Sequence, residues 1–486
     1  MDFNLKAQSF NSVKWITLGN IAPKLITPLI TIGLTRIIKP ELYGILSICI
    51  LINSFAEIIQ GFGVIDYIIK EDKISKLSLN TAFIFNIFLS ILLYLIIILL
   101  SPFIANYFSK KILLSIIPLS STAILVNAIG SVPYAILIKN MEFKKLFLRQ
   151  LVPIVANIMI TLPLALLGLN IYALILGLLA QIFLTNMLYV IFSRWKPSLS
   201  FSLMKCKEIF SFGKWMVLER ITEYLYISSD RILLSLIGDL NFLGVYNLAS
   251  QFITIAIQVI RAPIQNLMFP LLSKVQRFKN LQKNIFLYFL RRITLSNIYG
   301  LSLLLPFCYL ISCTFLKKEW SLTPTLVSIL CIGQCFIQSI GPQRELLKIK
   351  NKANIYSLSL IAFLIISSPI YIIMFRWFNP ILFCFCKALS DFLMFLMQIF
   401  IIQFFLNINL NKFLKQIFAI FFISLLFNLL IYVLSNKVNY NFNNLLFLIF
   451  YLVISVFYIP IAYYFLFNKE FKKVVVDIRQ ITKVKK

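Results

Sequence analysis

The chain contains no histidine and little acidic charge. None of its 486 residues is His, and Asp and Glu together number only 17. Histidine is the usual side chain for acid/base catalysis near neutral pH and a common metal ligand, so its absence argues against both roles. The eight cysteines lie mostly within apolar runs, and Cys384 and Cys386 fall on nearly opposite sides of a helix. We therefore expect no metal site and no cofactor.

Two further features are missing. No Gly-x-x-x-x-Gly-Lys-Ser/Thr loop precedes a helix, so nothing indicates ATP hydrolysis. No hydrophilic stretch much exceeds the segment between Phe192 and Gly213, so there is no large loop to hold the active site of a glycan polymerase or ligase. The sequence therefore predicts a transporter rather than an enzyme.

Hydrophobic residues, in contrast, are abundant. They make up 60% of the chain, and the mean hydropathy is +0.92. This composition predicts an all-α, multi-pass membrane protein. The net charge of +29 would suggest nucleic acid in a soluble protein. Here we assign it to cytoplasmic loops, which accumulate Lys and Arg, and we expect no nucleic-acid partner.

Apolar runs of spanning length predict about 14 transmembrane helices. They cover residues 13–36, 43–65, 81–104, 113–138, 146–168, 170–192, 213–237, 242–267, 286–315, 323–343, 354–375, 378–405, 413–434 and 444–467. We expect an N-terminal six-helix lobe over 1–200 and a second over 201–405. Residues 406–486 would add two helices and a basic tail.

An internal repeat supports two pseudo-symmetric lobes. With an offset of 200 residues, Lys14-Trp15 aligns with Lys214-Trp215, and residues 42–44 align with residues 242–244. Repeats of this kind place a substrate site at their interface, near the middle of the membrane.

The distribution of basic residues predicts the orientation. An even number of spans puts both termini on one side. Most of the 46 Lys and Arg residues then fall in the termini and in the loops on that side. By the positive-inside rule, both termini are cytoplasmic.

The predicted helix 213–237 carries an unusual set of charges. They lie on one side of a helix and comprise Glu219, Arg220, Glu223, Asp230 and Arg231. A charge inside a membrane is costly, so such a stripe faces water, a ligand or another charge.

Other intramembrane polar residues fit the same picture. Lys24 and Arg261 have no acid one helical turn away. Together with Arg220 and Arg231, they predict a cationic cavity for an anionic headgroup such as phosphate. We expect polar side chains to line this cavity, namely Asn20, Glu57, Gln251 and Gln258.

An alternative is that the charges neutralise one another. Arg220 would pair with Glu223, Arg231 with Asp230 or Glu219, and Lys387 with Asp391. The acids Glu219, Glu223, Asp230 and Asp391 are also candidates for coupling to H⁺ or Na⁺, because an ion-coupled carrier needs groups that change charge or hold a cation.

Three motifs resemble those of the polysaccharide, or O-antigen repeat-unit, flippases. These belong to the superfamily of multidrug, oligosaccharidyl-lipid and polysaccharide exporters. The motifs are residues 38–44, Ser229-Asp230-Arg231 followed by residues 243–249, and the turn at 269–274. The similarity extends over at least the first eight spans. Asp230 and Arg231 match the family's motif in the seventh span.

The resemblance implies a V-shaped pair of lobes, alternating access and a polyprenyl-pyrophosphate-linked oligosaccharide as cargo. The location would be the bacterial inner membrane. The partners would be membrane lipids and the glycan polymerase and chain-length machinery. Two alternatives within the superfamily are a flippase for the peptidoglycan precursor and a cation-coupled multidrug exporter, the latter disfavoured by the cationic cavity.

Overall fold

The computed structural model describes residues 30–71, 75–139, 143–276, 278–340, 342–350, 352–411, 413–415, 417–419 and 421–422. All regular secondary structure in these residues is helical. Within this part of the chain, eight segments are long and apolar enough to cross a membrane. The prediction of a multi-pass helical membrane protein is thereby confirmed. Most of the first predicted span, and nearly all of the last two, lie outside the described residues.

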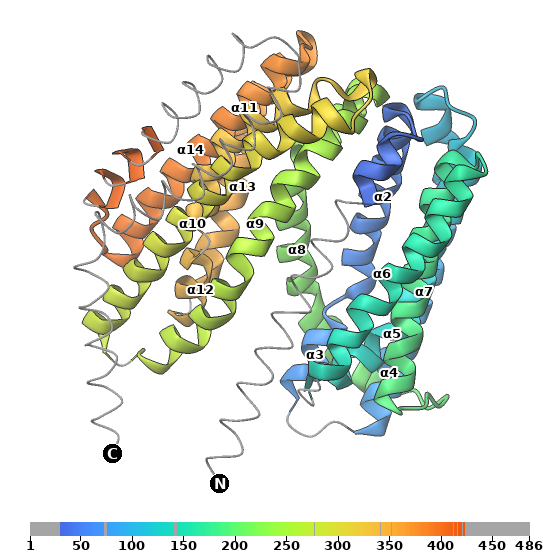
Figure 1. Ribbon diagram of the computed structural model, residues 1–486. Helices are drawn as coiled ribbons and strands as arrows, with labels where there is room; N and C mark the ends of the chain where they lie inside the picture. Colours follow the sequence, from blue (N-terminus) through green and yellow to red (C-terminus); the bar gives the residue numbers. More distant parts are fainter. Residues whose placement is uncertain are drawn as a thin grey trace. The chain divides into compact units, whose positions relative to one another are not determined.

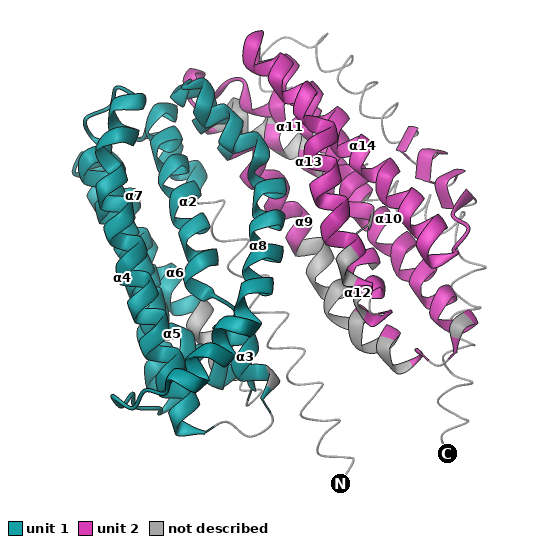
Figure 2. Ribbon diagram, turned by 180° about the vertical axis from the view of Figure 1, so that it is seen from behind, with its two compact units in different colours: residues 1–247 teal, residues 248–486 magenta. Residues whose placement is uncertain are grey.

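The chain divides into two compact units, Met1–Asn247 and Leu248–Lys486 (Figure 2). The boundary falls inside helix α9 (Leu240–Lys274), so the helix with the stripe of charges, which ends at Ile237, belongs to unit 1. The lobes 1–200 and 201–405 were defined by topology, and they stay a prediction.

Unit 1 is a bundle of long helices (Figure 1). Its elements are α2 (Pro40–Gly61), α3 (Val64–Lys70), α4 (Lys76–Tyr107), α5 (Leu113–Lys139), α6 (Phe143–Leu166), α7 (Asn170–Ser193), α8 (Leu203–Ile237) and the start of α9 (Leu240–Lys274). Helix α5 packs against α4 and α7, and α6 packs against α7. Helix α8 packs against α2, α3 and α4. Leu99 and Phe103 of α4 are more than 70% exposed, as expected for a face turned to lipid.

The helix predicted at 43–65 is interrupted. Helix α2 ends at Gly61, and Phe62 and Gly63 both have positive φ, 33° and 67°. The short helix α3 follows. A Cβ on Gly213 of α8 would collide with the carbonyl oxygen of Phe62, so the chain turns where α8 passes close to it. Hydropathy alone could not show this break, because the residues on both sides are apolar.

Helix α8 begins ten residues before the predicted span. Ser202 is its N-cap, and the Ser202 Oγ accepts a hydrogen bond from the backbone N–H of Lys205. The added turns contain Lys205, Lys207 and Glu208, which lowered the hydropathy of this stretch and hid the start of the helix.

In the described residues, unit 2 contains the rest of α9 and five further helices that can be given bounds. These are α10 (Lys279–Thr314), α11 (Thr323–Ile337), α12 (Pro342–Ile349), α13 (Ala353–Arg376) and α14 (Pro380–Leu406). The predicted helix 323–343 ends early: a 3₁₀ turn, Gln338–Ile340, follows α11, and α12 starts at Pro342, which has no backbone N–H to continue the helix. The core between α10, α11 and α14 contains Phe286, Phe336 and Phe395.

Candidate functional site

Arg220 pairs with an acid that the sequence did not suggest. Its Nη2 lies 2.5 Å from Oδ2 of Asp66 on α3, and the two side chains are 36% and 33% exposed. Asp66 comes after the break at Phe62 and Gly63, which turns α3 toward α8. The predicted pairing of Arg220 with Glu223 used spacing along one helix, and it missed a partner from another helix.

Asp230 links α8 to α9 next to the turn between these two helices. The Tyr246 hydroxyl at the start of α9 donates a hydrogen bond to Oδ2 of Asp230 near the end of α8. Oδ1 of Asp230 accepts a hydrogen bond from the backbone N–H of Arg231 at 2.8 Å. The two parts of the second motif that carried the resemblance, Ser229-Asp230-Arg231 and residues 243–249, therefore touch. The half-buried Arg231 keeps an Nε that has no hydrogen-bond partner in the described residues.

Glu57 belongs to a series of hydrogen-bonded polar side chains that links α2, α5 and α7 in unit 1. Its Oε1 accepts a hydrogen bond from Asn127 of α5 at 2.8 Å, and the amide oxygen of Asn127 accepts one from Asn186 of α7 at 2.9 Å. Gln60, one turn later on α2, donates to Asn86 of α4 at 2.7 Å. Amides inside an apolar bundle are costly unless they are bonded, so these contacts fix the packing of α2.

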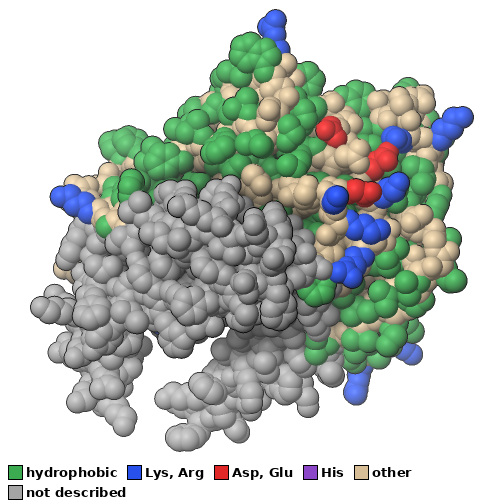
Figure 3. Space-filling view, turned by 45° about the horizontal axis from the view of Figure 1, so that its top comes forward, with side chains coloured by type: hydrophobic (Ala, Val, Ile, Leu, Met, Phe, Trp, Pro, Cys, Tyr) green, Lys and Arg blue, Asp and Glu red, His purple; other side chains and the backbone are tan. Residues whose placement is uncertain are grey.

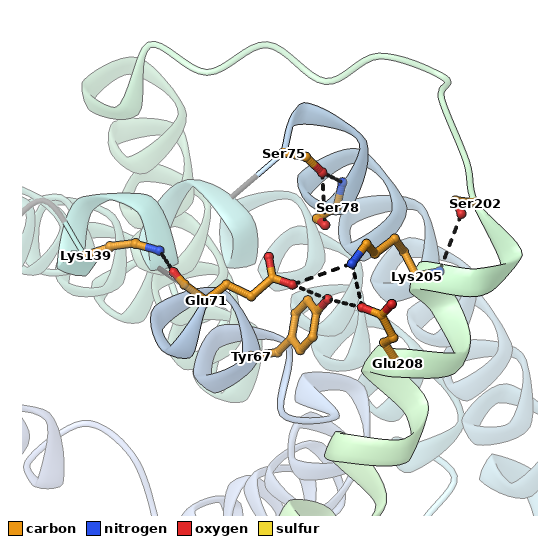
Figure 4. A network of polar contacts seen from close by, with 8 residues as sticks. All are labelled: Tyr67, Glu71, Ser75, Ser78, Lys139, Ser202, Lys205 and Glu208. Carbon is orange, nitrogen blue, oxygen red and sulfur yellow. Dashed lines mark hydrogen bonds and ion pairs between the residues drawn. The ribbon is translucent and has the colours of Figure 1, made fainter. Parts of the chain in front are cut away.

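A second polar network lies at the end of unit 1 that is predicted to face the cytoplasm (Figure 4). The Tyr67 hydroxyl lies 2.6 Å from Oε1 of Glu71 and 3.0 Å from Oε2 of Glu208. The Lys205 ammonium donates to Glu208 at 2.7 Å and lies 3.9 Å from Glu71. Lys139 of α5 donates to the carbonyl oxygens of Ile68 and Glu71, where α3 ends.

Charge determines the protonation of this network. The hydrogen bond from Lys205, followed by the one from Tyr67, lowers the pKa of Glu208. The hydrogen bond to Glu208 raises the pKa of Lys205. Both groups are therefore held in their ionised forms around neutral pH, and they tie the first turn of α8 to α3.

In unit 2, one predicted pairing is confirmed. The Lys387 ammonium lies 2.9 Å from Oδ1 of Asp391, and both residues are buried. Oδ2 of Asp391 accepts a hydrogen bond from Gln334 of α11 at 2.8 Å. Both oxygens of this acid are thus engaged.

The polar face of α9 is less buried than its apolar face. Gln251 is half-buried and Gln258 is exposed, whereas Ile253 and Ile257 are buried. The side chain of Arg261 on the same helix is outside the described residues, as are Asn20 and Lys24. Their place in a cavity stays a prediction.

Glu219 and Glu223 are half-buried on α8. On the face shown in Figure 3, hydrophobic side chains dominate the described surface, and Lys and Arg side chains gather with Asp and Glu side chains in one area. No group of three or more metal-ligating residues occurs in the described part of the chain.

Known proteins are similar to this chain in both sequence and fold. A family model described as polysaccharide biosynthesis protein matches residues 33–320. The lipopolysaccharide biosynthesis protein WzxC of Escherichia coli is 26% identical over 365 residues, or 72% of each chain. The teichuronic acid biosynthesis protein TuaB of Bacillus subtilis is 23% identical over 306 residues, which are 62% of this chain and 63% of TuaB.

Among solved structures, the lipid II flippase MurJ in an inward closed conformation is similar, with a TM-score of 0.71 and 14% identity over 94% of this chain and 98% of MurJ. An inward-facing multidrug resistance transporter of the MATE family has a TM-score of 0.55 and 13% identity over 80% of this chain and 92% of the transporter. At these identities the likeness concerns the fold alone.

Proposed function

The chain belongs to the polysaccharide biosynthesis protein family and is a membrane transporter, and we propose that it flips a polyprenyl-pyrophosphate-linked oligosaccharide across the bacterial inner membrane. The observation that carries this proposal is the part-exposed Arg220 on α8, a helix predicted from the sequence to cross the membrane, next to Glu219 and one turn from Glu223. A cation kept partly accessible within a span suits an anionic cargo.

Arg220 is equipped to exchange partners. A guanidinium has five N–H donors, and the contact with Asp66 uses Nη2. The remaining donors are available to a pyrophosphate, which accepts two parallel hydrogen bonds from arginine. In our proposal Arg231, Lys24 and Arg261 also face the cargo, and Asn20, Glu57, Gln251 and Gln258 line its path.

The polyprenyl tail stays in lipid while the headgroup crosses by alternating access. Synthesis would load the cargo on the cytoplasmic side, where we place both termini. A glycan polymerase and its chain-length machinery would consume the product. Coupling to H⁺ or Na⁺ is assigned to Glu219 and Glu223. Asp230 and Asp391 are further candidates, and each would have to leave the bonds it makes with Tyr246 or with Lys387 and Gln334.

A second candidate cargo is the lipid-linked peptidoglycan precursor, favoured by the similarity of the fold to the lipid II flippase. Family membership and the similarity to WzxC and TuaB favour a surface glycan. A drug exporter is disfavoured, since organic cations would be repelled by the predicted excess of bases.

Purified protein in proteoliposomes distinguishes these cargoes. Fluorescent polyprenyl-pyrophosphate glycans and fluorescent lipid II are placed in the membrane, and a membrane-impermeant reductant reports the fraction in the outer leaflet. We expect transport of the surface-glycan unit that falls in Arg220→Ala. Transport of lipid II alone would favour the peptidoglycan precursor, and transport of neither would contradict the proposed function.

A further inference from the structure

The segment between α7 and α8, together with the first two residues of α8, forms a strap, defined here as residues 194–204. Its polar side is fastened to the start of α4. The backbone N–H of Ser198 donates to Oδ1 of Asn80 at 3.2 Å, and the Asn80 amide donates to the hydroxyls of Ser198 and Ser200. The backbone N–H of Ser202 donates to Oγ1 of Thr81 at 3.1 Å. Figure 4 shows Ser202 where the strap enters α8.

The other side of the strap is apolar and exposed. Leu199 is 96% exposed, Leu203 is 72% exposed and Met204 is 74% exposed. Phe201 adds a further exposed ring. Exposed apolar side chains on a segment held by so many hydrogen bonds indicate that something outside unit 1 covers them.

The charge of the strap indicates what covers its exposed apolar side chains. Residues 194–207 contain no acid, and Arg194, Lys196 and Lys207 are exposed. The strap also starts immediately after Ser193, the last residue of a helix long and apolar enough to span a membrane. Basic residues interleaved with apolar ones at the end of a span are typical of segments that lie in the headgroup layer of a bilayer.

We propose that the strap binds the membrane surface, with Leu199, Leu203 and Met204 inserted at the boundary between headgroups and acyl chains. Arg194, Lys196 and Lys207 then contact the phosphates of anionic lipids. This interaction holds the start of α8 at the membrane surface. Because Lys205 bonds to Glu208 and lies close to Glu71 at the end of α3, the anchored end of α8 is also linked to α3. The inference is independent of which cargo is transported.

A fluorescent probe tests the proposal in the full-length protein. The probe NBD is attached to a single cysteine at Leu199 or Leu203, after replacement of the native cysteines, and the protein is placed in nanodiscs. In nanodiscs that contain phosphatidylglycerol, we expect blue-shifted emission, quenching by lipids with a nitroxide near the headgroup, and little quenching by aqueous iodide. A probe at Ser109, in the exposed α4–α5 turn, should stay open to iodide.

Matched charge variants test the role of the bases. Replacement of Arg194, Lys196 and Lys207 by Gln should remove the difference between phosphatidylglycerol and phosphatidylcholine nanodiscs. Replacement of Lys111, Lys317 and Lys318 by Gln changes the charge equally at exposed sites and should keep that difference. If the cysteine replacements prevent folding, a benzophenone amino acid at Leu199 of the unmodified chain should crosslink to phospholipid.

Two results would overturn the proposal. Equal iodide quenching at Leu199 and Leu203 in both kinds of nanodisc would show that the strap lies in water. Crosslinking to a soluble protein, with no phospholipid product in nanodiscs, would assign the apolar side to a protein partner instead.

Discussion

Gly44 and Gly244 take equivalent positions in a reciprocal contact between α2 and α9. A Cβ on Gly44 would collide with the carbonyl oxygen of Leu240, and a Cβ on Gly244 would collide with that of Pro40. Each glycine thus faces the residue that lies four positions before the other glycine, and these two residues, Pro40 and Leu240, are themselves 200 positions apart. A contact of this kind, in which i meets j and j meets i, is the signature of two-fold symmetry. It joins residues of the repeat that the sequence indicated.

The first prediction concerns these glycines. Gly44→Ala and Gly244→Ala should each destabilise the protein by about 1–3 kcal/mol, because the helix backbones cannot move apart without losing other contacts. The control is Gly33→Ala, since nothing lies within 4 Å of a Cβ at Gly33. Thermal unfolding in detergent is followed with a thiol-reactive dye that reports exposure of buried cysteines such as Cys49 and Cys331. Equal melting temperatures for all three variants would show that the contact is loose.

The second prediction separates binding from stability at Arg220. The ion pair with Asp66 is one-third exposed, so it should contribute only about 0.2–1 kcal/mol. Asp66→Asn should therefore leave the melting temperature nearly unchanged, while Arg220→Ala should strongly reduce transport. The exchanged variant, Asp66→Arg with Arg220→Asp, keeps the pair but moves the cation. Its transport should stay low. Full transport by the exchanged variant would mean that Arg220 serves packing rather than cargo.

The third prediction concerns the buried pair in unit 2. Lys387→Ala leaves the Asp391 carboxylate buried without its ammonium partner, and loss of one partner of a buried pair costs about 3–5 kcal/mol. A double variant, Lys387→Met with Asp391→Leu, should be far more stable than Lys387→Ala and should still transport. If the double variant folds but does not transport, Asp391 has a role in coupling.

The sequence predicted the helices of this chain well and their interruptions poorly. Spans such as 113–138 and 170–192 match α5 and α7 to within a residue, because long apolar runs bounded by loop residues leave little choice. The break at Phe62–Gly63 was missed, since it depends on the approach of Gly213 from a distant part of the chain.

The same limit applies to the candidate site. The pairing of Lys387 with Asp391 was predicted because the two residues lie one turn apart on one helix. The partner of Arg220 was not, because Asp66 lies 154 residues away and beyond the end of α2. Hydrogen bonds of Asn127, Asn186 and Asn80 were also missed: a single amide in an apolar run gives no signal of its partner.

The fourth prediction concerns Arg261 and Lys24. Both are expected to contact the pyrophosphate. Arg261→Lys keeps the charge but loses the two-pronged hydrogen bonding, so transport should fall less than in Arg261→Ala. The double variant Arg261→Ala with Lys24→Ala should abolish display of the surface glycan at normal expression. Full display by the double variant would remove both residues from the site.

The orientation of the chain has a direct test. In a cysteine-free background, a cysteine at Ser109 should react with an impermeant thiol reagent from outside the cell, and one at Lys196 should not. Both positions are exposed in the structure. Gln282, near the start of α10, is also predicted to lie on the cytoplasmic side. It is a poor reporter, since it is 95% buried and a cysteine there would stay unlabelled on either side. Labelling at Lys196 in intact spheroplasts would reverse the predicted topology.

The last prediction concerns the driving force. A flippase that does not hydrolyse ATP either runs downhill as its product is consumed or couples to an ion. Glu219 and Glu223 lie one helical turn apart on α8, half-buried, and beside Arg220. Ion coupling needs a group that changes charge or holds a cation, and in our proposal these two acids supply it. Glu223→Gln should then lower transport in proteoliposomes and flatten its dependence on pH, with no change in melting temperature. Asp239→Asn, half-buried just before the first residue of α9, is the control for loss of one acid and should keep the pH dependence. Transport that is unaffected by Glu223→Gln, by collapse of the pH gradient and by replacement of Na⁺ would leave the two acids as charge balance for the arginines of α8, and the protein as a downhill carrier.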